Sequence, residues 1–294
     1  MAWTAKIRRW KSLASKAQVY AAPYIPRHLK EGNRQFRLPV LSYGQPTALT
    51  TEPWLADWIT WLLEQSPGPF LDVGANIGQT LLKVKARLPE QAYIGFEPNA
   101  ANVFFLERLI ERNGIEAATV VPVGLSTQSG LLGLARASVY DTSASLIDGF
   151  RPSKAYGAGK VFVPVLTGDA VLAELDVTAI GLIKIDVEGG EPEVLSGLEQ
   201  SLQAARPPIL CEVLPTQTHD DEIARFRRER KTQLEALLAR LGYQIYRLCD
   251  AHARAEQIAS FPDDADLSAA DYLFIPQENK PLLAALTAKS EPHS

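Results

Sequence analysis

From residue 70 onward, short hydrophobic runs alternate with segments in which apolar side chains recur every three or four positions. The runs contain few polar residues, which is typical of strands buried on both faces of a parallel sheet. The other segments have the period of amphipathic helices. We predict strands at 70–73, 93–96, 119–123, 182–187, 209–213, 244–248 and 272–275. We predict helices at 51–65, 79–87, 100–112, 191–204 and 232–241.

This alternation predicts one doubly wound α/β domain of about 200 residues, with helices on both faces of the sheet. Ligands of such sheets bind beyond the carboxyl ends of the strands, so binding side chains are expected there. We divide the chain into an N-terminal basic extension (1–50), a main domain (51–280) and a C-terminal tail (281–294).

The composition fits a globular protein, with 46% hydrophobic and 22% charged residues. No apolar run reaches the roughly 20 residues of a membrane-spanning helix. Residues 1–30 also lack the apolar stretch and cleavage site of a secretory signal. The two cysteines, Cys211 and Cys249, offer neither a disulfide framework nor a zinc site. A cytoplasmic location is therefore expected.

Residues 1–30 are basic, with seven Lys or Arg residues and no acidic one, although the whole chain has a net charge of −4. Trp3, Ile7, Trp10 and Leu13 follow helical spacing within this segment. A basic amphipathic helix can lie on an anionic membrane surface, which would place the protein at the inner face of the membrane. The alternative is packing on its own domain or on a second subunit, as a homodimer. The acidic remainder of the chain argues against nucleic acid as a partner.

The first predicted strand leads into Asp72-Val-Gly74-Ala-Asn76-Ile-Gly78, directly before a helix. Glycine permits a tight turn close to a ligand, and the helix start offers unpaired N–H groups. A dinucleotide fingerprint requires Gly-x-Gly-x-x-Gly, whereas these glycines are four positions apart. The Asp72 carboxylate would repel a pyrophosphate but attract the ammonium group of a methionine moiety. The turn therefore favours S-adenosylmethionine over NAD.

Two further strand ends carry candidate ligand contacts. Glu97 follows the second strand, where a carboxylate accepts hydrogen bonds from both ribose hydroxyls of a nucleoside. The alternative is a solvated acid stabilised by the dipole of the following helix. Gly124, Leu125 and Ser126 follow the third strand and are expected to flank the adenine.

The fourth and fifth strands supply the candidate catalytic groups. Lys184, Asp186 and Glu188 alternate with apolar residues and would share one side of an extended segment. Because buried charges are costly unless paired or used, we interpret Asp186 and Glu188 as catalytic candidates. A structural ion pair between Lys184 and Asp186 is the alternative. Glu212 at the end of the fifth strand and His219 in the next loop are further candidates.

Together these strings resemble the FkbM-type methyltransferase family over residues 52–215. They are Asp72-Val-Gly-Ala-Asn-Ile-Gly78, Phe96-Glu-Pro-Asn99 and Lys184-Ile-Asp-Val-Glu-Gly189. The resemblance implies a class I methyltransferase, Rossmann-like α/β fold with a seven-stranded, mostly parallel sheet whose last strand is antiparallel. It also implies S-adenosylmethionine as donor and a hydroxyl oxygen of a sugar, glycan or polyketide-like molecule as acceptor.

Carried over by position, the resemblance assigns residues to each part of the donor. Asp72, Gly74, Asn76 and Gly78 would line its methionine part, and Glu97 would hold its ribose. Asp186 and Glu188 would lie near the transferring methyl group.

Methyl transfer to a hydroxyl needs help from a base or a metal, because a neutral hydroxyl is a weak nucleophile. Asp186, Glu188, Glu212 and His219 are the candidate bases. In the alternative, Asp186, Glu212 and His219 hold Mg²⁺, which prefers hard oxygen ligands. A further alternative is a scaffold that binds S-adenosylmethionine without turnover. The basic run at 225–231 is expected either to bind an acidic group of the acceptor or to form a solvated helix face.

Overall fold

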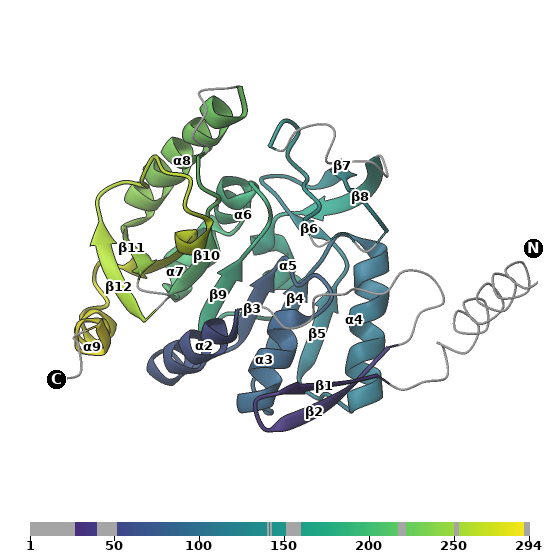
Figure 1. The fold of residues 1–294 in the computed structure, drawn as a ribbon. Coiled ribbons are helices and arrows are strands. Elements are labelled where there is room, and N and C mark those ends of the chain that lie inside the picture. The colour runs from purple at the N-terminus through teal and green to yellow at the C-terminus, as the bar shows by residue number, and fades with distance from the viewer. Residues whose placement is uncertain are drawn as a thin grey trace, which may run out of the picture.

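The computed structural model describes residues 27–39, 52–139, 141, 143–150, 160–216, 222–249 and 253–290. Its centre is an eight-stranded sheet of order β12-β11-β13-β10-β9-β3-β4-β5 (Figure 1). The adjacent parallel strands are β10 (Ile209–Glu212), β9 (Leu182–Ile185), β3 (Phe70–Val73), β4 (Tyr93–Phe96) and β5 (Ala118–Val121). This order is that of a Rossmann-like class I methyltransferase fold, which confirms the predicted fold class.

The last strand, β13 (Asp271–Pro276), runs antiparallel to β10 and to β11 (Tyr243–Cys249), as predicted. An eighth strand, β12 (Arg254–Ile258), pairs with β11 at the edge of the sheet. Its sequence, Arg-Ala-Glu-Gln-Ile, lacks a hydrophobic run because an edge strand is only partly buried. The sheet therefore has one strand more than the sequence predicted.

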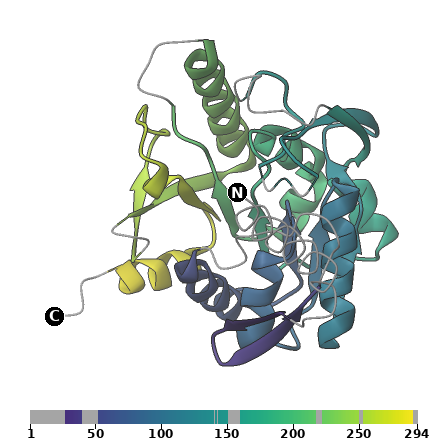
Figure 2. The ribbon, with the colours of Figure 1, turned by 45° about the vertical axis from the view of Figure 1, so that its right-hand side comes forward.

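Helices cover both faces of the sheet (Figures 1 and 2). Because side chains alternate along a strand, Phe70 and Leu71 enter different hydrophobic clusters on opposite faces. One face packs α2 (Pro53–Gln65), α3 (Gln79–Arg87), α4 (Ala100–Asn113) and α9 (Lys280–Ser290). The other packs α5 (Gly168–Glu174), α6 (Glu191–Gly197), α7 (Glu199–Ala205) and α8 (Glu222–Leu241).

Two helices differ from their predicted extents. The helix predicted at 191–204 is divided into α6 and α7 at Leu198. Next to the division, Gly197 approaches the Ser126 carbonyl so closely that a Cβ atom would lie 2.2 Å from its oxygen. Helix α8 begins ten residues before the predicted start at 232. Its first turns bury Arg227 and Lys231, although the prediction of a helix from its hydrophobic period expects apolar residues at buried positions.

Two smaller sheets complete the described fold. A hairpin of β1 (Arg27–Glu31) and β2 (Arg34–Leu38) packs beside α3 and α4. A three-stranded sheet contains β6 (Gly124–Leu125), β7 (Gly130–Ala135) and β8 (Lys160–Leu166). Between β12 and β13 the chain forms a 3-10 turn at Leu267–Ala269.

The predicted division of the chain remains a prediction at its ends. Residues 1–26 lie outside the described residues, so membrane contact and homodimer formation through this segment also stay predictions. Helix α9 occupies most of the segment predicted as a tail and buries Leu282 and Leu286. Among the described helices, none has the length and apolar character needed to cross a bilayer.

Candidate active site

A cavity lies beyond the carboxyl ends of β3, β4 and β9, where open α/β sheets bind their ligands. It encloses about 760 Å³, including the space at its open mouth. Its walls come from the β3–α3 turn, the β4–α4 loop, the β9–α6 loop, β6, β7 and residues 141 and 144–147. This is the edge of the sheet at which the sequence predicts a ligand site, and binding there remains a prediction.

The β3–α3 turn brings its backbone to the cavity. The N–H groups of Gly74 and Ala75 both donate to the Phe96 carbonyl, and each N···O distance is 3.0 Å. Gly74 has a φ of +89°, and a Cβ atom there would lie 1.9 Å from the Asp186 carbonyl oxygen. Asn76 also lines the cavity, whereas Gly78 caps α3 outside the cavity walls. The missing side chain at Gly74 therefore sets how closely the β3–α3 turn approaches the β9–α6 loop.

Glu97 presents a fixed carboxylate at the cavity wall. Its Oε2 accepts the Asn76 N–H at 2.8 Å, and its Oε1 accepts the Asn99 N–H at 2.8 Å. Oε1 also accepts a longer hydrogen bond of 3.5 Å from Asn102 Nδ2, so Oε2 keeps one of its two acceptor positions for a ligand. Burial raises the pKa of Glu97 to about 7, although both backbone hydrogen bonds act in the opposite direction.

This raised pKa predicts a pH-dependent cost of keeping Glu97 charged. The neutral carboxyl stabilises the fold below its ordinary pKa of 4.5, and this stability is lost as the pH rises through about 7. We expect the free energy of unfolding of the ligand-free protein to fall relative to a Glu97→Gln variant between pH 5 and pH 8. Urea unfolding at both pH values measures this. Exposed Glu107→Gln should run parallel to the wild type, and a constant difference for Glu97→Gln would contradict the expectation.

Two polar residues at the cavity were not predicted as site residues. Asn102 Nδ2 donates to Asn76 Oδ1 at 3.1 Å and to the Asp141 carbonyl at 3.3 Å. Asn102 and Asp141 both line the cavity and are buried. A signal for Asn102 was available, since an amide in the first turn after Glu97 faces the same strand end. Asp141 depends on a loop whose path the sequence does not indicate.

The predicted adenine-flanking residues do line the cavity. Gly124, Leu125 and Ser126 form β6 and the residue after it. Apolar side chains continue this wall, and they are Val123, Leu134, Leu146 and Ile147. Their role toward adenine remains a prediction.

Asp186 lines the cavity next to a buried cation. Lys184 Nζ lies 3.0 Å from Asp186 Oδ2 and 4.0 Å from Asp72 Oδ1. Glu212 forms a side-chain hydrogen bond with Asp186, and the charge of Asp186 together with burial raises the pKa of Glu212 well above its usual range. A hydrogen bond between two carboxyl groups requires a proton on one of them, and the raised pKa of Glu212 favours protonation of this pair. It lines a smaller neighbouring cavity that also includes Asp186, Glu52 and Asp271.

Asp72 does not reach the cavity, contrary to its predicted position at the donor. Val73 faces the cavity, and the alternation along β3 turns Asp72 to the other face. There Asp72 is fully buried and accepts a hydrogen bond of 2.6 Å from Tyr93 Oη. Burial raises the pKa of Asp72 to about 6.

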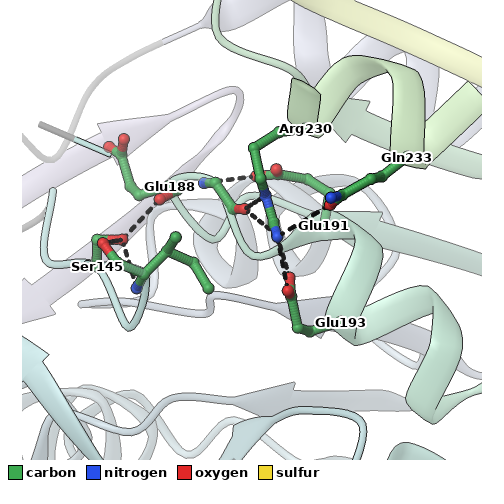
Figure 3. Close-up of polar contacts among 8 residues, drawn as sticks. Ser145, Glu188, Glu191, Glu193, Arg230 and Gln233 are labelled. Carbon is green, nitrogen blue, oxygen red and sulfur yellow. Dashed lines mark hydrogen bonds and ion pairs between the residues drawn. The ribbon is translucent and has the colours of Figure 1, made fainter. Parts of the chain in front are cut away.

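The β9–α6 loop is held from two sides (Figure 3). Ser145 Oγ donates to the Glu188 carbonyl at 2.7 Å. Arg230 of α8 donates to the Gly189 carbonyl at 2.7 Å and pairs with Glu193. In Figure 3 the Glu188 side chain points away from Arg230, and Glu188 lines the cavity. These contacts fix the loop that carries two of the predicted catalytic residues.

Most of the basic run of α8 contacts other parts of the protein. Arg227 donates to the Pro215 carbonyl at 3.0 Å, and Lys231 donates to the Pro262 carbonyl at 2.8 Å. Arg228 pairs with Asp263, and Arg230 with Glu193. Arg227, Arg230 and Lys231 thus tie α8 to neighbouring loops, whereas Arg225 and Arg228 lie on a solvated face, one of the two roles expected for the run.

The described residues do not fit a magnesium site. No group of three potential ligands is found among them, and His219 lies outside them. At Asp186 the Lys184 ammonium already lies against one carboxylate oxygen, where it would repel a divalent cation. We therefore derive no step through a metal.

Comparison with known proteins identifies the family. A family model described as Methyltransferase FkbM domain matches residues 72–245. The chain belongs to this family. It is 30% identical over 154 residues to "Hexuronic acid methyltransferase AglP" of Haloferax volcanii, covering 50% of this chain and 58% of that protein. It is 30% identical over 168 residues to "31-O-demethyl-FK506 methyltransferase FkbM" of Streptomyces tacrolimicus, covering 47% and 63%.

The chain thus spans less than two thirds of the length of these curated relatives. Among solved structures, a methyltransferase FkbM from Methylobacillus flagellatus is 17% identical with a TM-score of 0.41, covering 72% of this chain and 44% of that one. An O-methyltransferase from Bacillus cereus in complex with SAH is 13% identical with a TM-score of 0.43, covering 77% and 82%.

Proposed function

We propose that this FkbM-family chain transfers a methyl group from S-adenosylmethionine to a hydroxyl oxygen of a small-molecule or glycan acceptor. One observation carries the proposal: a single cavity unites the Gly74 turn, the Glu97 carboxylate and the Asp186 carboxylate. The names of two relatives, which mention a hexuronic acid and a 31-O-demethyl compound, support an acceptor of this class.

The cavity walls suit the chemical parts of the proposed donor. The open acceptor position on Glu97 Oε2 suits a hydroxyl of a ribose. The apolar wall of Val123, Leu125, Leu146 and Ile147 suits an adenine ring. When bound, S-adenosylmethionine supplies an electrophilic methyl group and leaves as a neutral thioether.

We assign the general base to Asp186. It lines the cavity with 34% of its side chain exposed, so an acceptor hydroxyl can reach it. Lys184 and Glu212 both contact its carboxylate and orient it. The acceptor hydroxyl gives its proton to Asp186. At the same time the acceptor oxygen forms the new bond to the methyl carbon, and the bond between this carbon and the donor sulfur breaks. Base assistance of this kind contributes about 10²–10⁴-fold to a rate.

Replacing Glu97 with alanine is expected to weaken binding of S-adenosylmethionine by about 10–100-fold, because hydrogen bonds to a charged group are lost. Isothermal titration of the purified protein measures the dissociation constant. Glu107→Ala is the matched control, since Glu107 is an exposed glutamate on α4. Absence of binding to the wild type would contradict the proposed donor, and equal affinity of both variants would remove Glu97 from the site.

A further inference from the structure

Three buried polar side chains form a row behind Asp186, on neighbouring strands of the sheet. Tyr93 Oη donates to Asp72 Oδ2 at 2.6 Å, and Lys184 Nζ lies 4.0 Å from Asp72 Oδ1. Asp72 and Lys184 are register partners on β3 and β9. The three residues are between 0% and 8% exposed, and none of them lines the large cavity. The row ends at Asp186, whose Oδ2 lies 3.0 Å from Lys184 Nζ.

We propose that Lys184 is a positioning residue that keeps Asp186 ionised at the cavity wall, with Asp72 as its second counter-ion. This inference rests on the proposed function, in which Asp186 accepts the acceptor proton.

The surroundings of Asp186 show why a cation is needed there. Glu212 on β10 contacts it directly, and Asp271 on β13 is the register partner of Glu212. Glu52, before α2, borders the same small cavity, and Glu188 follows Asp186 in the β9–α6 loop. Every one of these groups is acidic, and like charges favour the protonated form of a carboxyl. Lys184 acts against them from its contact distance.

Lys83 of α3 is the other buried lysine of this region. It interacts electrostatically with Glu52, Glu31, Lys184 and Asp72, and burial lowers its pKa. Asp186 is not among the strongest of these interactions. Lys83 therefore resembles Lys184 in burial but not in its contact with Asp186.

The charge balance explains the place of Asp72. Before transfer, Asp186 and Glu212 share one proton, and Lys184 compensates their negative charge. After transfer, the pair holds two protons and is neutral, so a lysine paired with Asp186 alone would be left as a buried unpaired charge. Such a charge is costly. Asp72 lies on the other side of Lys184 and compensates it in both states.

The test measures the titration of Asp186 directly, without an acceptor. The protein is labelled with ¹³C at the aspartate carboxyl carbons, and its NMR signals are followed from pH 4 to pH 9, with Asp186→Asn to assign the resonance. We expect Lys184→Met to raise the pKa of Asp186 by about one unit or more. Lys184→Arg, which keeps the charge, should restore most of the wild-type value.

Lys83→Met is the matched control for loss of a buried lysine, and it should leave the Asp186 titration unchanged within about 0.5 units, below the change expected for a contacting charge. If Lys184→Met does not fold, Lys184→Gln removes the charge while retaining a hydrogen-bond donor. An unchanged Asp186 titration in the uncharged variants, or an equal change in Lys83→Met, would overturn the inference. Failure of the proposed function is a separate result, since it appears as absent donor binding by the wild type.

Discussion

Replacement of Asp186 by asparagine is expected to lower kcat by about 10²–10⁴-fold, the contribution of a general base. The substitution keeps the shape of the side chain but removes the proton acceptor at the cavity wall. Binding of S-adenosylmethionine should stay within about threefold, since the ribose and adenine walls are untouched. The measurement is formation of the thioether product with a hydroxyl compound that supports turnover by the wild type.

Glu188→Gln is the matched control for this prediction, because Glu188 is a second carboxylate at the same cavity. Glu188 lies outside the Lys184 contact, so we expect its replacement to lower kcat by less than about tenfold. A larger loss in Glu188→Gln than in Asp186→Asn would transfer the role of base to Glu188. Losses confined to KM in both variants would show that the carboxylates bind the acceptor rather than deprotonate it.

The central sheet was predictable because its strands are buried on both faces. Strands β3 and β4 and helix α3 have the predicted bounds, since buried runs and amphipathic periods leave a strong trace in the sequence. Strand β12 and the small sheet of β6, β7 and β8 were not predicted. The burial of β12, β7 and β8 is partial, and Leu131 and Phe162 remain 68% and 78% exposed, while β6 is buried but has only two residues. Without a continuous buried face, a strand has no clear hydrophobic pattern.

Buried basic side chains are a second reason why the structure differs from the prediction made from the sequence. Lys85 lies in the core and donates to four carbonyls, at distances from 2.7 to 3.2 Å. Arg227 and Lys231 similarly occupy inward positions of α8 and bind loop carbonyls. A basic residue in a helix is most often solvated, so sequence periodicity assigns such positions to the surface. Their partners are set by loops that are distant in sequence.

The residues of the candidate site also divide into those whose positions the sequence predicted and those whose positions it did not. The turn at Gly74 and the carboxylate of Glu97 depend on local order along the chain, and both lie at the cavity as predicted. The direction of Asp72 depends on which face of β3 its side chain enters. Alternation along the strand fixes this direction, because Val73 faces the cavity. The position of Asp72 behind Lys184 needs the pairing of β3 with β9, which the sequence alone does not give.

Replacement of Gly74 by alanine is expected to cost about 3 kcal/mol or more of unfolding free energy, by left-handed strain together with overpacking. Its φ of +89° disfavours a side chain, and the new Cβ would lie 1.9 Å from the Asp186 carbonyl oxygen. Backbone atoms must move to relieve this contact, and the atoms in question belong to both walls of the donor cavity. We therefore also expect the affinity for S-adenosylmethionine to fall by more than about tenfold.

Gly114→Ala separates the two causes of this loss. Gly114 has a φ of +55°, but no atom lies within 4 Å of the position of its Cβ. This variant should therefore show the cost of left-handed strain alone, about 1 kcal/mol, with unchanged donor affinity. Urea unfolding and isothermal titration of both variants give the comparison. If Gly74→Ala matched Gly114→Ala in both measurements, the close approach of the β3–α3 turn to the β9–α6 loop would not control the geometry of the site. If instead the affinity for S-adenosylmethionine falls by more than the lost stability predicts, the result would show what the close approach does. It would show that the approach holds the donor turn and Asp186 at their working distance.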